Sequence, residues 1–252
     1  MLLVKGENIM ANPILNEDFA RAEERVLSAP PMTINGTINK TFLLFAFAAI
    51  PAFYTWSQFL AGFVDKAMML TTIGAIVGFI MAMIIAFSKN KFFIPMYAAC
   101  EGLFLGGISA MFEKQYPGIA FQAVSGTFAA LFSMLALYKL NLIRCTDKFR
   151  GVIFTATVSI ALLYLMQIIA SFFHYSIPGI FESGMVGIGF SILVVSIAAL
   201  NLIIDFDFIE RGAQNMAPRD FEWYGAFGLM VTLVWLYIEI LKLVAKLRDN
   251  NN

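Results

Sequence analysis

Seven apolar runs follow one another along this chain, and short polar connections separate most of them. A helix rises about 1.5 Å per residue, so each run is long enough to cross a hydrocarbon core of about 30 Å. Charged residues make up 13% of the chain, against roughly 25% in soluble domains. The sequence therefore predicts an all-α, polytopic membrane protein that forms a seven-transmembrane-helix bundle. The predicted spans are residues 41–64, 67–87, 92–112, 119–140, 152–173, 185–209 and 226–244.

The domain organisation predicted from this pattern is simple. Residues 1–40 form a polar cytoplasmic N-terminal arm, and residues 41–248 form one membrane domain. Within the arm, Asn16 before two acidic residues resembles a helix start, and Pro30 and Pro31 would end that helix. A short amphipathic helix at the membrane surface is one interpretation, and a partly disordered tail is the other. The arm holds no apolar region beside a small-residue cleavage site, so a removable signal peptide is not expected.

The distribution of lysine and arginine predicts the orientation. If the N-terminus is cytoplasmic, twelve of these bases fall on that side and five on the other. Basic residues collect on the cytoplasmic side of membrane proteins, so the N-terminus is predicted inside and the C-terminus outside. Three of the five opposing bases follow the last span, which leaves a six-span model with one re-entrant segment open.

Four acids lie in or beside the predicted spans: Glu101, Asp205, Asp207 and Glu239. A carboxylate within lipid is costly, so such a side chain should face protein, water or a partner. Glu101 can be interpreted as a helix-end residue that bonds a neighbouring hydroxyl or lysine. Asp207 can be interpreted as a solvated charge, because Glu210 follows within one turn. Asp205 and Glu239 each follow a long apolar run and are harder to place at a surface.

Two interpretations of Glu239 remain open at this point. In the first, Thr232, Trp235, Glu239, Lys242 and Lys246 form one stripe at helical spacing, and Glu239 pairs with Lys242. In the second, Glu239 meets Asp205 across the sixth and seventh spans. Two carboxyl groups in hydrogen-bond reach would share a proton and titrate as a pair. Such a pair would respond to pH.

Glycines recur at a spacing that favours close helix packing. Gly74 and Gly78 form a GxxxG pattern in the second span, and Gly102 and Gly106 form another in the third. Helices within lipid associate largely by packing, and small residues let their backbones approach. These glycines are expected to bring neighbouring helices together.

Several motifs in the chain resemble the Bax inhibitor-1 family, also called the transmembrane Bax-inhibitor-motif family, including its bacterial YccA branch. They extend from Met32 to about Leu247, with the first 31 residues outside, and are closest to a bacterial subgroup. The motifs are MTINGTINKT, EGLFLGGIS, YPGIAFQAV, ALNLIIDFDFIE and FEWYGAFGLMVTLVWLYIEIL.

The resemblance implies a bundle whose seventh helix is central and surrounded by the other six. It also implies a pH-sensitive Ca²⁺ leak in a bacterial plasma membrane, with Ca²⁺ as permeant ion and no resident cofactor. The family's pH-sensing acids match Asp205 and Glu239, which would bind Ca²⁺ transiently. The seventh-span acid is usually aspartate in the family, and the loop between the two acids is longer here. Accessory roles near the gate would fall to Asp207, Glu101, Arg211, Lys89 and Lys91.

The alternative function is a non-conducting interaction protein in the lipid bilayer. YccA-like relatives are associated with a membrane-bound AAA protease, and the family is named for suppressing cell death. In this alternative the protein would modulate a membrane protease or a stress response. The arm would then be the docking element. Net charge is zero and no nucleic-acid partner is expected. An enzyme is not expected, because the motifs GxSxG, HExxH and GxxxxGK[ST] and the Gly-x-Gly-Asp signature of intramembrane aspartyl proteases are all missing.

Overall fold

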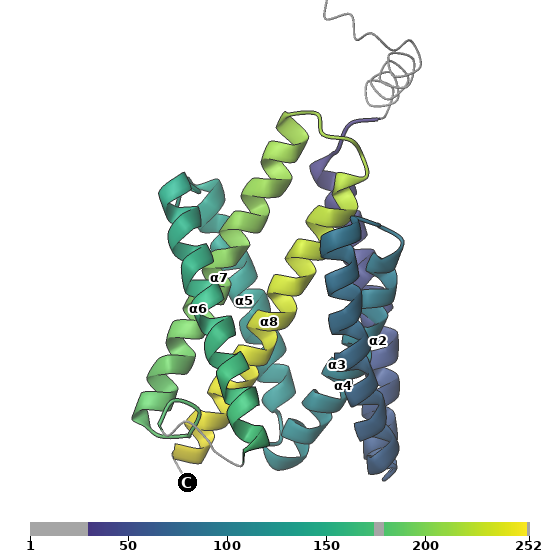
Figure 1. Ribbon diagram of the computed structural model, residues 1–252, viewed down its shortest axis with the longest axis vertical. Helices are drawn as coiled ribbons and strands as arrows, with labels where there is room; N and C mark the ends of the chain where they lie inside the picture. Colours follow the sequence, from purple (N-terminus) through teal and green to yellow (C-terminus); the bar gives the residue numbers. More distant parts are fainter. Residues whose placement is uncertain (1–29, 174–178, 251–252) are drawn as a thin grey trace, which may run out of the picture.

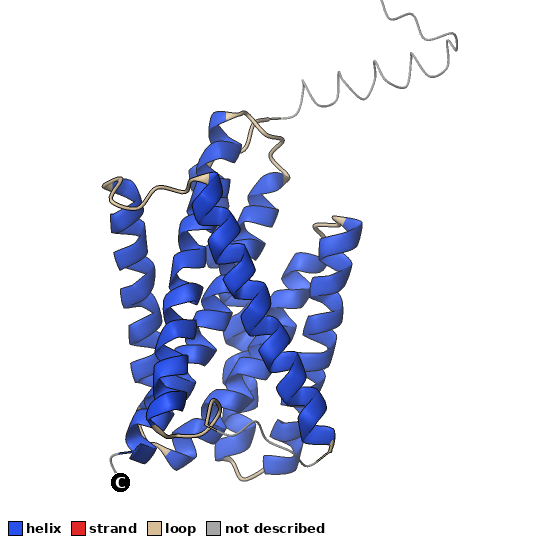
Figure 2. Cartoon of the chain, turned by 60° about the vertical axis from the view of Figure 1, so that its left-hand side comes forward, coloured by secondary structure: helices blue, strands red, loops and turns tan. Residues whose placement is uncertain are grey.

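The computed structural model describes residues 30–173 and 179–250, and this part of the chain contains seven helices and no strand (Figures 1 and 2). All seven are long and apolar enough to cross a membrane. The prediction of an all-α seven-helix bundle is therefore confirmed. The helices are α2 (Ile34–Leu60), α3 (Val64–Ser88), α4 (Phe93–Gln115), α5 (Ile119–Lys139), α6 (Asp147–Phe172), α7 (Met185–Gln214) and α8 (Phe221–Asn250).

Several helices extend beyond the predicted apolar spans. Helix α2 begins at Ile34, where the Thr33 side chain caps it by accepting a hydrogen bond from the Gly36 amide at 2.9 Å. Helix α7 continues to Gln214, and α8 begins at Phe221. Hydropathy marks only the apolar part of a helix, whereas its hydrogen bonding continues into charged residues at the membrane surface. The amphipathic helix expected after Asn16 lies outside the described residues.

Helix α8 occupies the centre of the bundle. It packs against α2, α4, α5 and α7, and in Figure 1 it runs diagonally between α6 and α7 on one side and α2 to α4 on the other. The predicted central position of the last helix is confirmed. Helix α3 instead packs on α2 and α4 and has no backbone contact with α8 within the described ranges. Helix α6 likewise has no backbone contact with α8 in the described residues and reaches it through the Tyr164 side chain, so the expectation that all six other helices pack around α8 is wrong at the backbone level for α3 and α6.

The core divides into two main clusters that meet at α8. Leu236 and Leu241 of α8 pack with residues of α5 and α7, and both are fully buried. Ala226 and Met230, nearer the start of α8, pack with α2 and α4. Because α8 belongs to both clusters, it joins the two halves of the bundle.

Three of the four GxxxG glycines mark close approaches between helices, as predicted, and the fourth, Gly78, makes an ordinary contact. A Cβ added at Gly102 or Gly106 would lie 2.1 or 2.2 Å from a backbone carbonyl oxygen of α2. A Cβ at Gly74 would lie 2.6 Å from the Cys100 carbonyl oxygen of α4. No real Cβ fits at these distances, so α2, α3 and α4 depend on glycine to form one layer.

We expect Gly106→Ala to destabilise the bundle, because α2 and α4 must move apart to admit the methyl group. Overpacking of this kind costs about 1–3 kcal/mol, so the thermal midpoint in detergent should fall by several degrees. Gly189→Ala in α7 is the matched control, since a Cβ there meets nothing within 4 Å. Alanine favours helix by about 1 kcal/mol over glycine, so this control should be neutral or stabilising. Equal effects of the two substitutions would contradict the close approach.

Candidate functional site

Polar side chains of α6, α7 and α8 meet along one face of the central helix, and we call this set the polar seam. Its α8 members recur at helical spacing, so they lie on one stripe, as predicted for the residues around Glu239. The α6 and α7 members face this stripe or each other. The seam consists of Thr157, Tyr164, Asn201, Asp205, Thr232, Glu239 and Lys242.

Asp205 is the member of the seam with the fewest partners. Its carboxyl group faces α8, where the Thr232 hydroxyl lies beside it and a Cβ at Gly228 would lie 3.5 Å from Oδ1. The other oxygen, Oδ2, is buried and accepts no hydrogen bond from the described residues. A buried charge without a full set of donors is costly. Of the two acids in the seam, Asp205 is therefore the one with an oxygen open to a proton or a cation.

Asn201 continues the seam one turn before Asp205 on α7. Its side-chain amide donates to Thr157 Oγ1 of α6 at 2.9 Å and to the Ile197 carbonyl oxygen at 2.9 Å. This bond connects α6 to α7 on the same side of the bundle as Asp205. The sequence analysis did not single out Asn201, although an amide inside an apolar span is a signal for such a contact.

Glu239 is buried but well paired. Its side chain is 2% exposed, the Tyr164 hydroxyl of α6 donates to Oε2 at 2.8 Å, and Lys242 Nζ donates to Oε1 at 3.1 Å. The Lys242 ammonium also lies 4.7 Å from the centre of the Tyr164 ring. Of the two interpretations of Glu239, the structure has the first, the local pair with Lys242. Tyr164 is a partner that the sequence analysis missed.

Asp205 and Glu239 do not meet. Asp205 is level with Gly228 and Thr232, and Glu239 lies two turns beyond Thr232, about 10 Å along α8. The helix ends explain the difference, because a shared pair required α7 to end deeper or α8 to begin later. Instead α7 extends to Gln214 and α8 begins at Phe221. The expected carboxyl pair is therefore replaced by two acids at separate levels of one seam.

Asp207 lies near the end of the seam and is not solvated. Its side chain is 6% exposed, Arg150 Nη2 of α6 donates to Oδ2, and Arg211 Nε lies 2.8 Å from the same oxygen. The interpretation of Asp207 as a solvated charge is wrong, because α7 and α6 both cover it. Arg211 contacts one of the four acids, as an accessory base near a gate would. Arg150 was not predicted as a partner.

The other predicted accessory residues lie away from the seam. Glu101 of α4 lies beside the Tyr97 hydroxyl, faces α3 at Gly78, and has one buried oxygen, Oε2, without a hydrogen bond from the described residues. This matches the interpretation in which a neighbouring hydroxyl binds Glu101. Lys91 pairs with exposed Asp220 at 2.5 Å. The backbone carbonyl oxygen of Lys89 accepts a hydrogen bond from the Tyr224 hydroxyl. Neither contact involves Asp205 or Glu239.

A second buried acid, Glu222, joins the start of α2 to the start of α8. Its side chain is 1% exposed and accepts hydrogen bonds from the Thr33 amide and hydroxyl, both at 2.9 Å, and from Lys40. The adjoining backbones also pair, because the Met32 amide donates to the Ala217 carbonyl at 2.7 Å. The sequence analysis missed this clamp. The sequence signal for this clamp was an acid shortly before the last predicted span, Glu222, together with a lysine directly before the first predicted span, Lys40.

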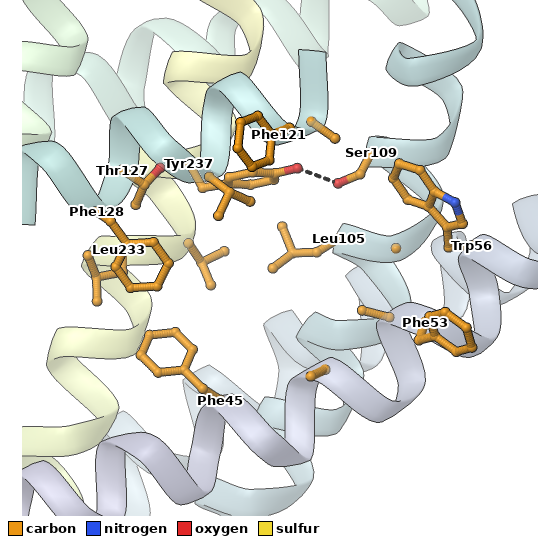
Figure 3. A pocket seen from close by; sticks show the side chains of 16 residues that line it. Phe45, Phe53, Trp56, Leu105, Ser109, Phe121, Thr127, Phe128, Leu233 and Tyr237 are labelled. Carbon is orange, nitrogen blue, oxygen red and sulfur yellow. Dashed lines mark hydrogen bonds between the residues drawn. The ribbon is translucent and has the colours of Figure 1, made fainter. Parts of the chain in front are cut away.

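The opposite face of α8 borders a cavity of about 560 Å³ between α2, α4, α5 and α8 (Figure 3). Aromatic and aliphatic side chains line it, and its principal polar feature is the 2.6 Å hydrogen bond between Ser109 and Tyr237. No charged side chain of the described residues borders it. A hard cation needs oxygen ligands, so the polar seam is the better candidate for contact with ions.

The described residues contain no cluster of three or more His, Cys, Asp or Glu side chains that could hold a metal ion. Asp205 and the Thr232 hydroxyl together offer few oxygen ligands. A tight Ca²⁺ site uses roughly six to eight. The seam suits transient contact with a cation better than storage of one.

The fold and the site define a polytopic seven-helix membrane protein with several acids buried among its helices. A family model described as Bax inhibitor 1 like matches residues 12–249, so the chain belongs to that family. The match begins upstream of Met32, so the view that the first 31 residues lie outside the resemblance is wrong for residues 12–31. A search of curated proteins found no match.

We expect Lys40→Met to destabilise the protein, because the buried Glu222 carboxylate loses its closer cation and keeps only Arg219, whose Nε lies 3.8 Å from Oε2. Breaking a buried ion pair on one side costs about 3–5 kcal/mol. Adding Glu222→Gln should recover part of this loss. The matched control is Lys91→Met, whose partner Asp220 is 61% exposed, and which should change stability by less than about 1 kcal/mol. Thermal unfolding of the four proteins in one detergent measures these effects, and an equal loss in Lys40→Met and Lys91→Met would exclude the clamp.

Proposed function

We propose that this protein is a pH-sensitive cation leak of the Bax inhibitor-1 type, with Ca²⁺ as its permeant ion. The proposal places the ion-contacting groups in the polar seam between α6, α7 and α8. Asp205 and Glu239 act at two successive levels of the seam, in place of one shared carboxyl pair. Family membership supports the general class, and the buried, incompletely bonded Asp205 is the observation that carries the proposal.

The chemistry of the two acids supports different roles. Glu239 already has a hydroxyl donor and an ammonium partner, so an arriving cation must compete with Lys242. Asp205 has the Thr232 hydroxyl beside it and one oxygen free to bind a proton or a cation. A permeating ion must bind weakly enough to leave. Asp205 would therefore be the main pH-responsive group, and the Glu239–Lys242 pair would set a second barrier.

The same geometry favours conduction over catalysis. A two-acid protease needs both carboxyl groups within hydrogen-bond reach of one water, and the two seam acids lie on levels about 10 Å apart. We therefore propose no enzymatic activity and assign no cofactor.

We propose that the N-terminus is cytoplasmic, the C-terminus external and the membrane a bacterial plasma membrane. The helix ends that carry Lys40, Lys91, Lys139 and Arg150 belong to the same end of the antiparallel bundle. Basic residues favour the cytoplasmic side. With this orientation Asp205 lies in the cytoplasmic half of the seam and Glu239 lies deeper.

A non-conducting interaction protein, with a membrane-bound AAA protease among its conceivable partners, is the second candidate. The observation that favours it is the family match from residue 12, which includes most of the arm. The chain leaving the arm is also tied to the start of α8, since the Arg219 amide donates to the Pro30 carbonyl at 3.0 Å. An arm that docks on a partner would thus act directly on the central helix. Deletion of residues 1–29 separates the candidates, because a leak should survive it and docking through the arm should not.

We expect purified protein in dye-loaded liposomes to let Ca²⁺ enter at a rate that changes across roughly pH 6 to 8. Asp205→Asn should flatten this pH response, because the amide keeps the shape of the side chain and cannot change its charge. The matched control is Asp220→Asn, an exposed acid at the end of the bundle, which should keep the wild-type response. Dye-loaded liposomes give the rates. The leak fails as a function if folded wild-type protein behaves like empty liposomes at every pH.

The separation of the two acids makes a further prediction about the double variant. Sites more than about 7–10 Å apart usually add within about 0.5 kcal/mol, or roughly twofold in a rate. We therefore expect the effects of Asp205→Asn and Glu239→Gln on the Ca²⁺ leak rate to multiply. A strongly non-multiplicative double variant would show that the acids act as one coupled pair.

A further inference from the structure

A second hollow, of about 360 Å³, lies where α6 begins and α7 ends. Four α7 side chains at helical spacing border it, namely Ile204, Phe208, Arg211 and Asn215. The rest of the lining consists of Arg150 of α6, Gly212 of α7, Ala217 of the following loop and Phe221 of α8. A hollow of this size admits a small ligand group. It combines two guanidinium groups with an apolar rim, which the proposed leak does not use.

The two arginines are held in place on the protein side of the hollow. Both bind Asp207 Oδ2, Arg150 through Nη2 and Arg211 through Nε. Each also reaches Cys145, since Arg150 Nε lies 3.4 Å from Sγ and Arg211 Nη2 lies 3.3 Å from the carbonyl oxygen. Because these contacts fix the guanidinium planes, little side-chain freedom remains to be lost when a ligand binds.

The charge of this cluster favours an anion. One carboxylate, Asp207, faces two guanidinium groups, so the cluster keeps a net positive charge. Each guanidinium has five N–H donors as a rule, and the contacts with Asp207 and Cys145 leave donors of both arginines available. The nearby acid Glu210 faces Tyr138 of α5 and does not border the hollow. Guanidinium donors in this arrangement match the oxygens of a phosphate group.

The surroundings favour a phosphate that belongs to a lipid. Phe208 and Phe221 on the rim are exposed, and so is Phe154, which follows Arg150 by one turn on the same face of α6. This surface suits acyl chains. Bases in the loop between α5 and α6 and at the adjoining helix ends attract an anionic leaflet within about a Debye length. These bases are Lys139, Arg144 and Lys148.

We propose that this hollow binds the phosphate of an anionic phospholipid, with Arg150 and Arg211 as its donors. The acyl chains then follow the apolar surface beside Phe208 and Phe221. The lipid would connect the start of α6 to the end of α7. Its phosphate would lie beside the two ion pairs that Asp207 forms, one with each arginine. This site stands apart from the leak, and neither proposal depends on the other.

The test uses the full-length protein in neutral detergent, with lipid binding counted by native mass spectrometry. We expect phosphatidylglycerol to bind about tenfold more tightly than phosphatidylcholine, as charge-assisted hydrogen bonds of this strength imply. Arg211→Gln should weaken phosphatidylglycerol binding by about tenfold. Ala217→Leu should also weaken it by filling the hollow, and it leaves both arginines and Asp207 intact.

Lys148→Gln is the matched control, because it removes a charge from the first turn of α6 without altering the lining of the hollow. We expect it to change phosphatidylglycerol binding by less than about twofold. An equal loss in Lys148→Gln and Arg211→Gln would overturn the proposal in favour of general attraction to a basic surface. Wild-type binding in Ala217→Leu would also overturn it. Inorganic phosphate is the third arm, and if it displaces the lipid at equal concentration, the hollow is a site for free phosphate and the lipid proposal fails.

Discussion

The structure depends on how a central membrane helix keeps carboxyl groups away from lipid. Helix α8 carries Glu222 near its start and Glu239 beyond its middle, and both are buried. Each has a cation and a hydroxyl as partners, Lys40 with Thr33 for the first and Lys242 with Tyr164 for the second. These partners come from α6 and from the start of α2 as well as from α8 itself. The acids therefore help to fix which helices surround α8 and at what depth.

This requirement gives α8 two different faces. The stripe with Thr232, Glu239 and Lys242 faces α6 and α7, and polar bonds continue there between Asn201 and Thr157. The opposite face is apolar and borders the cavity that contains the Tyr237 hydroxyl (Figure 3). Aromatic and aliphatic side chains of α2, α4 and α5 line the cavity beside this face. A charge could be accommodated on the first face and not on the second, so the seam is where chemistry can occur.

The sequence was sufficient for the architecture and for part of the site. Apolar length predicted seven helices, and helical spacing predicted the stripe and offered the Glu239–Lys242 pair as one of two interpretations, because both signals are local. The pairing of Asp205 with Glu239 was wrong, because it depended on where α7 ends and α8 begins. Hydropathy does not report those ends, since Gln214 and Phe221 lie beyond the apolar spans. Partners such as Arg150 and Tyr164 come from α6, and their contacts are set by packing between helices that no local pattern reveals.

The unequal partners of the two seam acids bear on how pH could act. Glu239 is already paired, because the Tyr164 hydroxyl donates to Oε2 and Lys242 Nζ donates to Oε1, so a cation at this level must compete with Lys242. For Asp205, the Thr232 hydroxyl can donate to a carboxylate or accept from a carboxylic acid, so it adapts to both states. One acid is thus occupied by partners within the protein, and the other has a partner that suits either protonation state and one oxygen that accepts no hydrogen bond from the described residues. A sensor needs the second property and a fixed barrier needs the first, which is why separation of the acids along α8 suits a pH-dependent leak better than a shared pair would.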